Sequence, residues 1–584
     1  MLRIEKERRT NRIRGNAMRR RLLGAMLSVA LMVGLLVPLG LLLSSGADTA
    51  LDQKQAAIAR ALELEQERKA LPAPVSVQPV MDIEDIWAIE DTRTEAEHAL
   101  VTQMYREEEK LGYDAESSTF YCTLGIDTGD AWPEISLNVR GAEGVQVVWV
   151  DDYSYDWCED AISQGYRYEL LAYTQDEFAY IGLVFTGMPI VTLDVEDEIG
   201  RQDVPGRATI SAAGYAPVDT AVIAHERGGG YFKVISKWSY KMEFHTLGAN
   251  GKDEKNVMSV LGMEPDSDWL LLANAQDNTT VRNKIAWDIW NDWHAQGEGL
   301  MCMDSELVEL FINDEYKGIY QLMQRVQPER EISRIGGDVS SDIVLRIISS
   351  VNDSTKPVWD LTKEDVDFRL EYRYEPNGND RRVFDLAKDY VELSRRDEAK
   401  QMDDAEFEKT LLERVDIESM LHYILFFHAC SLRDNICNNI YLFMLEDDDG
   451  RMMIHHAPWD MDTAFWVKPP SEPHDSLRWP DLSMVLPRRM LDLDIGNCRE
   501  RMWQIWREKR ATILSDEAIY ERFTAMEEYV NATGAYLRET EKWYGGATEL
   551  NLSEMEYYEE RNLNLVELTM EEHWPIDGAM IDLQ

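Results

Sequence analysis

Two short polar segments lie beside apolar stretches in the last third of the chain. The first is L-R-D-N-I-C-N-N, in which Asp434 precedes Asn439 by five residues, and the second is A-P-W-D-M-D-T, which contains Asp460 and Asp462. A carboxylate can orient a hydroxyl group and accept its proton, whereas amide and carboxylate oxygens are ligands that Mg²⁺ prefers. These residue types at this spacing predict a site for phosphoryl transfer.

The elements predicted around these segments follow the order found in protein kinases. A helix from Ile417 to Cys430 precedes Asp434, and a hairpin with an acidic turn separates Asn439 from Asp460. In kinases, the aspartate of H-R-D-x-x-x-x-N accepts the hydroxyl proton, its asparagine binds metal, and an aspartate after a hairpin holds the Mg²⁺ on ATP. D-x-x-x-x-N alone is common in turns, but its order relative to W-D-M-D favours the catalytic interpretation. Asp460 and Asp462 point the same way if their segment is extended.

A cation for phosphate groups is predicted on an earlier strand. In K-W-S-Y-K-M-E-F, strand alternation places Lys237 and Lys241 on one face and the aromatic residues on the other. Upstream, Arg227 precedes a glycine run that can bring backbone N–H groups close to an anion. No Walker A or G-x-G-x-x-G string is present, and a solvated strand face is the alternative interpretation of each lysine.

Several strings together resemble a known family. They are R-G-G-G before K-W-S-Y-K-M-E-F, W-L-L-L-A-N-A-Q-D-N-T-T-V-R-N-K-I-A, F-I-N-D-E-Y-K-G-I-Y, L-R-D-N-I-C-N-N-I-Y-L-F, A-P-W-D-M-D-T-A-F-W and L-R-E-T-E-K-W-Y. From Met188 to Gly546, the chain resembles the spore coat protein H (CotH) kinase family. The resemblance implies an atypical protein-kinase-like fold and ATP-dependent phosphorylation of Ser or Thr hydroxyls on a protein, with Mg²⁺ or Mn²⁺.

The resemblance also implies roles for individual residues. Asp434 matches the catalytic aspartate, and the metal ligands are Asn439, Asp460 and, as a second carboxylate, Asp462. The nucleotide-binding residues are Arg227, Lys237, Lys241, Asp277, Arg282 and Asn283. The last three form a D-x-x-x-x-R-N string at the head of a helix, for which we expect either a structural clamp or a nucleotide contact.

The chain departs from the family pattern at Gln324, where an acidic residue is usual, and at Trp466, where a glycine is common. If the missing carboxylate positions the phosphate lysine, the lysine needs another partner. These departures support an alternative function, a weak or inactive kinase-fold protein that serves as a surface adhesion or scaffold protein of the cell envelope. A third interpretation groups His455 and His456 with the aspartates as a hydrolase metal site, but adjacent strand residues face opposite ways.

The N-terminus carries the features of a membrane anchor. Nine Lys or Arg against two Glu stand in residues 1–21, and residues 22–47 contain no charged side chain. An apolar run of this length can cross a ~30 Å hydrocarbon core, and positive residues tend to remain cytoplasmic. We therefore expect one membrane span with the main body extracellular, and a cleaved signal peptide is the rival interpretation.

The composition of the chain limits the classes of partner that it can bind. The formal net charge is −48, and removing the +7 of residues 1–21 leaves −55 on the remainder, which argues against nucleic acid and favours a Lys/Arg/Ser-rich protein substrate. The cysteines lack zinc-site spacing, and Cys122 and Cys158 are candidates for a disulfide within one small domain.

The fold class expected is α+β. Short strands between Ser117 and Leu193 predict a small β-sandwich-like module. The predicted order is a basic cytoplasmic tail (1–21), a transmembrane signal anchor (22–47), a helical stalk or linker (48–116), the β module (117–187), a CotH kinase-like domain (188–546) and an acidic C-terminal extension (547–584).

Overall fold

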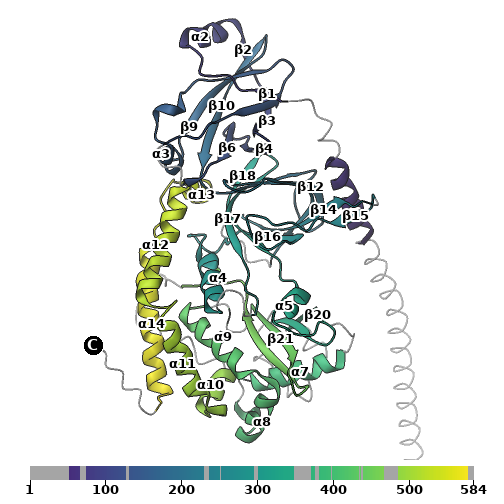
Figure 1. Cartoon of the computed structure of the whole chain (residues 1–584), viewed down its shortest axis with the longest axis vertical. Helices are drawn as coiled ribbons and strands as arrows, with labels where there is room; N and C mark the ends of the chain where they lie inside the picture. The colour runs from purple at the N-terminus through teal and green to yellow at the C-terminus, as the bar shows by residue number, and fades with distance from the viewer. Residues whose placement is uncertain are drawn as a thin grey trace, which may run out of the picture.

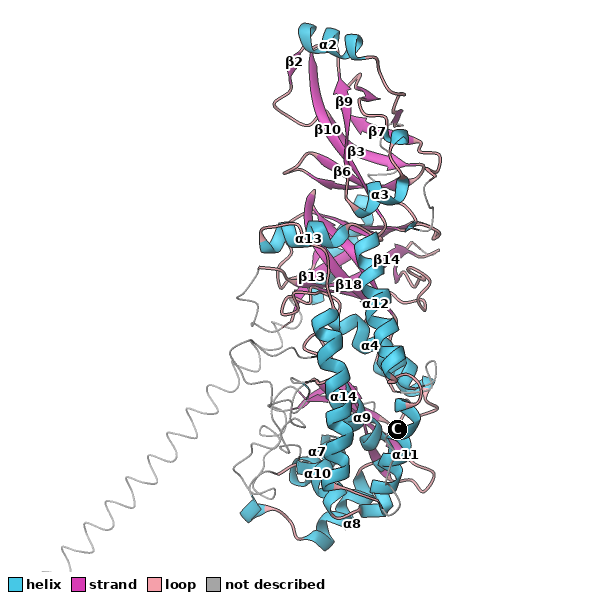
Figure 2. Cartoon of the chain, turned by 90° about the vertical axis from the view of Figure 1, so that its left-hand side faces the viewer, coloured by secondary structure: helices cyan, strands magenta, loops and turns pink. Residues whose placement is uncertain are grey.

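The computed structural model shows three parts stacked along the long axis of the molecule (Figures 1 and 2). A two-sheet β module lies at one end, a β-barrel in the middle, and a lobe of helices around a small sheet at the other end. The mixed α+β class predicted from the sequence is confirmed. The structure describes residues 51–65, 74–126, 131–228, 236–249, 251–294, 300–347, 370–374, 380–395, 398–432, 435, 439–465 and 485–576.

The β module consists of two sheets that share one hydrophobic core. The first sheet has the order β1 (Val75–Ser76), β7 (Leu137–Gly141), β3 (Val101–Arg106), β4 (Glu109–Lys110). The second has the order β5 (Gly112–Asp114), β6 (Thr119–Thr123), β10 (Glu177–Thr186), β9 (Arg167–Tyr173), β8 (Gln146–Trp149), with β2 (Thr94–Glu95) also paired to β10. Two short helices, α2 (Ile83–Thr92) and α3 (Cys158–Ser163), complete the module.

The segment expected to be a helical stalk contributes strands instead between residues 94 and 114. Its side chains Val101, Met104, Leu111 and Tyr113 are buried in the core of the module, and this burial outweighs the helical character of the preceding residues. In the same core, Cys122 and Cys158 of the described chain are buried thiols and do not form a disulfide. Burial raises the pKa of Cys122 to about 12.

Seven described strands close into a barrel. Around the ring they are β13 (Val218–Arg227), β12 (Val204–Ser211), β11 (Ile190–Val195), β17 (Ser305–Ile312), β18 (Glu315–Gln324), β16 (Asp268–Leu272) and β14 (Ser239–Leu247). The pairing of β13 with β14 closes the ring, and β15 (Asp253–Lys255) extends from β14. Closure leaves no exposed edge among these strands, and alternate residues such as Met242 and Phe244 fill the interior.

A helix over residues 51–65 packs against the outside of the barrel (Figure 1). Its apolar residues Ala57, Ile58, Ala61 and Leu62 recur at helical spacing and contact β13 at Ala221 and Ile223. The transmembrane prediction at 22–47 lies outside the described residues. None of the helices in the described ranges combines the length and apolar character that a membrane crossing needs.

The third part is a four-stranded antiparallel sheet surrounded by helices. The sheet has the order β20 (Leu370–Tyr374), β19 (Ile343–Ile347), β21 (Ile440–Glu446), β22 (Met452–Pro458). The hairpin predicted between Asn439 and Asp460 is confirmed as β21 and β22. The helices here are α4 (Arg282–Trp293), α5 (Pro328–Arg334), α7 (Asp380–Leu393), α8 (Asp404–Arg414), α9 (Ile417–Ala429), α10 (Val485–Asp492) and α11 (Cys498–Arg510).

The last helices tie the parts together. They are α12 (Asp516–Ala532), α13 (Ala535–Tyr544) and α14 (Ser553–His573). In Figure 1, α12 and α14 run beside the helical lobe, and α13 lies at the barrel, where it contacts β18. The segment expected to be an acidic extension thus contains α14, whose Met555, Leu563 and Val566 are buried in the largest hydrophobic core.

Candidate active site

The start of β21 and the end of β22 place two candidate metal ligands at one end of the sheet. Ile440 pairs with Pro458, and the backbone N–H of Trp459 donates to the carbonyl of Asn439 at 2.9 Å. The buried amide of Asn435 donates to the carbonyls of both Asn439 (3.1 Å) and Trp459 (2.7 Å). Three hydrogen bonds therefore hold Asn439 next to Trp459, the residue that precedes Asp460.

Both candidate ligands have left-handed backbone conformations. The φ angles are 55° at Asn439 and 56° at Asp460. Such conformations cost non-glycine residues about 1–3 kcal/mol and are concentrated at functional sites. The segment around Asp460 is therefore not extended, and a turn follows in which Ala464 N–H donates to the carbonyl of Met461. The premise that Asp460 and Asp462 share one strand face does not hold.

Asp277 and Arg282 hold the loop that follows Asp460. The buried Asp277 carboxylate accepts hydrogen bonds from the backbone and hydroxyl of Thr279 and from the backbone and Nε of Arg282. Arg282 Nη1 in turn donates to the carbonyls of Ala464 (2.8 Å) and Phe465. These contacts are those of a structural clamp, the first of the two roles expected for this string.

Asn283 extends the same clamp. Its side chain is fully buried, and its Oδ1 accepts from the backbone N–H of Met461 at 2.9 Å. Its Nδ2 donates to Gln321 Oε1 at 2.8 Å, so it links strand β18 of the barrel to the residue after Asp460. The clamp residues thus fix Asp460 from the barrel side.

Lys237 forms a buried ion pair with a residue from α13. Its Nζ lies 2.7 Å from Glu539 Oε1 and 2.7 Å from the carbonyl of Ile319, over the ring of Tyr320. The other oxygen of Glu539 accepts from the backbone N–H of Ile319 at 2.7 Å. The exposed fractions of the two side chains are 1% and 0%. A lysine paired with a glutamate is a standard part of protein kinase sites.

Burial acts on both members of this pair. It lowers the pKa of Lys237, although the Glu539 carboxylate opposes that shift, and it raises the pKa of Glu539. The charge of Asp277 acts in the same direction as Glu539 and raises the pKa of Lys237. Sequence reasoning did not assign Glu539, because its partner is 302 residues away. The signal available was the string L-R-E-T-E-K-W-Y, which contains it.

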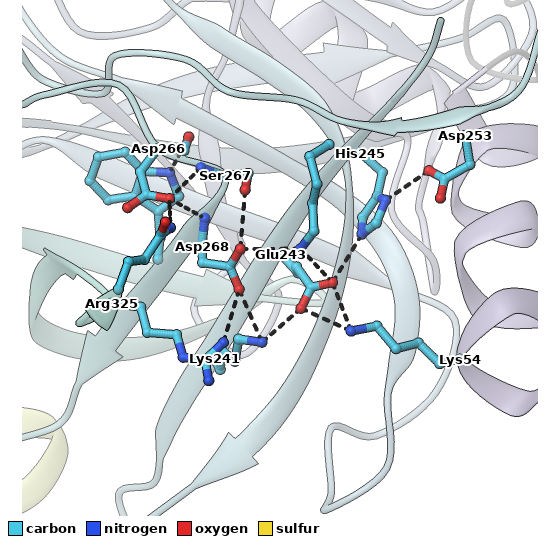
Figure 3. A network of polar contacts seen from close by, with 12 residues as sticks. Lys54, Lys241, Glu243, His245, Asp253, Asp266, Ser267, Asp268 and Arg325 are labelled. Carbon is cyan, nitrogen blue, oxygen red and sulfur yellow. Dashed lines mark hydrogen bonds and ion pairs between the residues drawn. The ribbon is translucent and has the colours of Figure 1, made fainter. Parts of the chain in front are cut away.

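Lys241 belongs to a different network (Figure 3). Its Nζ lies 2.7 Å from Glu243 and 3.1 Å from Asp268, and Lys54 from the helix over 51–65 also contacts Glu243. Burial alone would raise the pKa of Glu243, but hydrogen bonds from His245 and three lysines hold it below its ordinary value. The structure therefore separates Lys241 from Lys237, and the network of Lys241 is joined to the N-terminal helix through the Lys54–Glu243 ion pair.

Arg227 lies at the end of β13 with its guanidinium carbon 5.8 Å from the centre of the Trp459 ring. This contact brings a cation from the barrel to the residue before Asp460. Gly228 has a φ of 101°, and the rest of the glycine run lies outside the described residues. Arg227 thus lies beside the residue that precedes Asp460, and its role in binding a nucleotide stays a prediction.

Buried polar atoms beside Asp460 suit a polar ligand. In the part of the chain that the structure describes, Trp459 Nε1, Thr463 Oγ1 and Asn435 Oδ1 have no hydrogen-bond partner. Such atoms are costly unless a ligand or water satisfies them. A nucleotide with a hydrated divalent cation offers both donors and acceptors, so the residues present fit these groups.

The remaining candidates are less informative. Asp434 lies outside the described residues. Among residues 51–576 that are described, no three His, Cys, Asp or Glu side chains group as metal ligands. His456 is buried against the Tyr390 hydroxyl, and His455 lies near Asp416, so the two histidines do not join Asp460 in a common cluster.

Comparison with protein-family models decides the family. A model described as CotH kinase protein matches residues 225–565, more than half of the 584 residues. The chain belongs to the CotH kinase protein family. No curated protein matches the chain. Membership in the CotH family implies a protein kinase that uses ATP, and the matched region contains every candidate site residue described above.

The structure also bears on the departures of this CotH protein from the family pattern. Gln324 Nε2 donates to the carbonyl of Glu264 at 2.7 Å, whereas the carboxylate partner of Lys237 is Glu539. The loss of a carboxylate at Gln324 therefore leaves Lys237 with a charged partner. Trp466 lies outside the described residues.

Proposed function

We propose that this CotH protein is an atypical protein kinase that transfers the γ-phosphate of ATP to Ser or Thr hydroxyls of a protein. The observation that carries this proposal is the position of Asn439 and Asp460 at adjoining strand ends, with Arg227 beside them. The buried Lys237–Glu539 pair adds a second kinase-like feature from the barrel.

Each residue then has a distinct task. Asp434 orients the substrate hydroxyl and accepts its proton. The side-chain oxygens of Asn439 and Asp460, with Asp462 as a further carboxylate, would hold Mg²⁺ or Mn²⁺. When bound, such a cation would offset the negative charge of the phosphates. Lys237 contributes positive charge from the barrel, and the clamp keeps Asp460 in place during the reaction.

The arrangement of the lobes supports a kinase-like fold. The barrel supplies Arg227 and the lysine, while the helical lobe supplies the catalytic segment and the hairpin with Asn439 and Asp460. ATP would lie between these two parts, because residues from both meet at Trp459. The atypical character lies in the closed barrel and in α13, a C-terminal helix that provides the glutamate.

We further propose a basic protein substrate and an extracytoplasmic location. The charge of −48 favours a Lys/Arg-rich partner over nucleic acid. The basic segment 1–21 and the uncharged run 22–47 favour a single-pass membrane anchor with a cytoplasmic N-terminus. Proteolysis of a C-terminal tag on intact cells tests this topology, since protection of the tag from added protease contradicts it.

A phosphotransfer assay tests the proposed activity. We expect the detergent-solubilised full chain to label a basic, Ser-rich protein from ATP and Mg²⁺ or Mn²⁺. Asp434→Asn removes the proton acceptor and should lower the rate at least about a hundredfold, since general-base catalysis contributes typically 10²–10⁴-fold. Asp448→Asn is the control, because Asp448 is exposed in the turn of the hairpin.

Two negative results of this assay have different meanings. Equal labelling by the wild type and Asp434→Asn contradicts the role of Asp434. No labelling by any of the three proteins contradicts the kinase proposal on this substrate class and favours the scaffold alternative.

The scaffold alternative is favoured by the surface of the β module. Tyr155 and Trp157, beside α3, are 87% and 61% exposed. Exposed aromatic residues of this kind suit adhesion to a partner. A protein that binds envelope material through these residues and transfers no phosphate would fit this second function.

A further inference from the structure

We propose that Arg346 is a nucleotide-binding residue that competes with the divalent cation for Asn439 and binds the phosphates of ATP. This inference rests on the proposed kinase function and adds a residue to its site. The sequence alone gives Arg346 no role. It is a single charged residue in the otherwise apolar strand I-V-L-R-I.

The position of Arg346 is set by the sheet. It lies on β19, next to β21, where it pairs with Tyr441 two residues after Asn439. Its Nη2 donates to Asn439 Oδ1 at 3.1 Å. That oxygen is the atom expected to bind the metal. A guanidinium thus lies at the oxygen that we propose as a metal ligand.

Arg346 retains hydrogen-bonding capacity. Its Nε is buried and has no partner among the described residues. Within the same described part, no Asp or Glu forms an ion pair with this guanidinium. The buried Nε–H favours an acceptor nearby, since burying N–H donors without acceptors is costly, and an anion would also offset the charge of the guanidinium. Arginine is well suited to phosphate because its planar fork can donate two parallel hydrogen bonds.

Other cations near the site are less suited to this task. Lys237 is neutralised by Glu539, and Lys241 by Glu243 and Asp268. Arg282 is held by Asp277 and by backbone carbonyls. The triphosphate of ATP carries several negative charges. The two lysines, which are already paired with carboxylates, offset these charges only from a distance. Arg346 is therefore a cation that can contact the phosphates directly.

Competition at Asn439 follows from charge. A guanidinium and a divalent cation repel each other strongly at distances near 4 Å, so they cannot share Asn439 Oδ1. Removing the guanidinium should make the oxygen more available to a metal alone. The same change should weaken the binding of ATP, because it removes a phosphate ligand. Opposite effects on the two affinities distinguish this role from a structural one.

Calorimetric titration of the full chain in detergent tests the proposal without turnover. The probes are Mn²⁺ alone, ATP in the presence of Mn²⁺, and adenosine, which lacks phosphates. We expect Arg346→Gln to bind Mn²⁺ alone about threefold more tightly and ATP about tenfold more weakly, with adenosine binding unchanged. Arg451→Gln is the matched control, since Arg451 pairs with Asp447 at the opposite end of the β21–β22 hairpin.

Two results overturn the proposal. Unchanged ATP affinity in Arg346→Gln would show that Arg346 does not bind the phosphates. Equal weakening of ATP and adenosine would show that it only supports the structure of the site. Failure of the wild-type chain to bind ATP would contradict the proposed kinase function as well, so the two proposals fail in distinguishable ways.

Discussion

Glu539→Gln should lower the rate of phosphotransfer at least about a hundredfold and destabilise the protein by about 3–5 kcal/mol. The two carboxylate oxygens accept separate hydrogen bonds, one from Lys237 and one from the Ile319 N–H. Glutamine has one acceptor oxygen, so its NH₂ group must face one of these donors. The substitution also leaves the Lys237 ammonium buried without a counter-charge, which moves the lysine or deprotonates it.

Glu539 is a positioning residue, and a double variant separates its structural effect from its effect on the reaction. Replacing a buried ion pair with apolar residues is often neutral for stability. Lys237→Met with Glu539→Leu should therefore recover most of the urea midpoint lost in Glu539→Gln, while phosphotransfer stays low. Glu541→Gln is the control, because Glu541 is exposed on the same helix. Full activity of the double variant would contradict a role for the pair in the reaction.

Arg538→Met should lower the stability of the protein by about 3–5 kcal/mol, because it breaks a largely buried charge network. Arg538 donates from Nε and Nη2 to the two oxygens of Glu309, each at 2.8 Å. Glu309 also accepts from the hydroxyls of Thr186 and Tyr316. The network joins β10 of the module, two barrel strands and α13. Without Arg538, the Glu309 carboxylate has no cationic partner among the described residues, although the hydroxyls of Thr186 and Tyr316 still donate to it.

The urea midpoint measures this effect, and phosphotransfer should fall with it because Glu539 follows Arg538 on the same helix. The double variant Arg538→Met with Glu309→Leu should be more stable than Arg538→Met alone. Arg561→Met on α14 is the control, since Arg561 is exposed and lies over the Tyr557 ring; it should change stability by about 0.5 kcal/mol or less. Equal midpoints for Arg538→Met and the wild type would contradict the network's contribution.

Elements that local patterns determine could be predicted from the sequence. Helix α9 and the hairpin of β21 and β22 are found where apolar runs and an acidic turn predicted them, so Asn439 and Asp460 come to adjoining strand ends. The alternation of β14 also holds, with Met242 and Phe244 inside the barrel and Lys241 outside. These features depend on the hydrophobic periodicity of a few consecutive residues, and contacts with neighbouring elements do not change them.

Features that depend on distant residues could not be predicted in this way. Closure of the barrel requires β13 to pair with β14 and β11 to pair in parallel with β17. The partner of Lys237 comes from α13, and Lys241 pairs with Glu243 and Asp268 rather than with the candidate site. Arg346 reaches Asn439 across a sheet whose order is not evident from the sequence. One sequence contains no local signal for such contacts.

The position of the transferred label tests the kinase account most directly. The full chain is incubated with a basic, Ser-rich protein and a divalent cation, and with ATP labelled at either the γ- or the α-phosphate. In-line γ-phosphoryl transfer predicts label from the γ-position alone, on Ser or Thr of the substrate, and its loss in Asp434→Asn. Label from the α-position would instead show transfer of the nucleotide, and it would contradict the account.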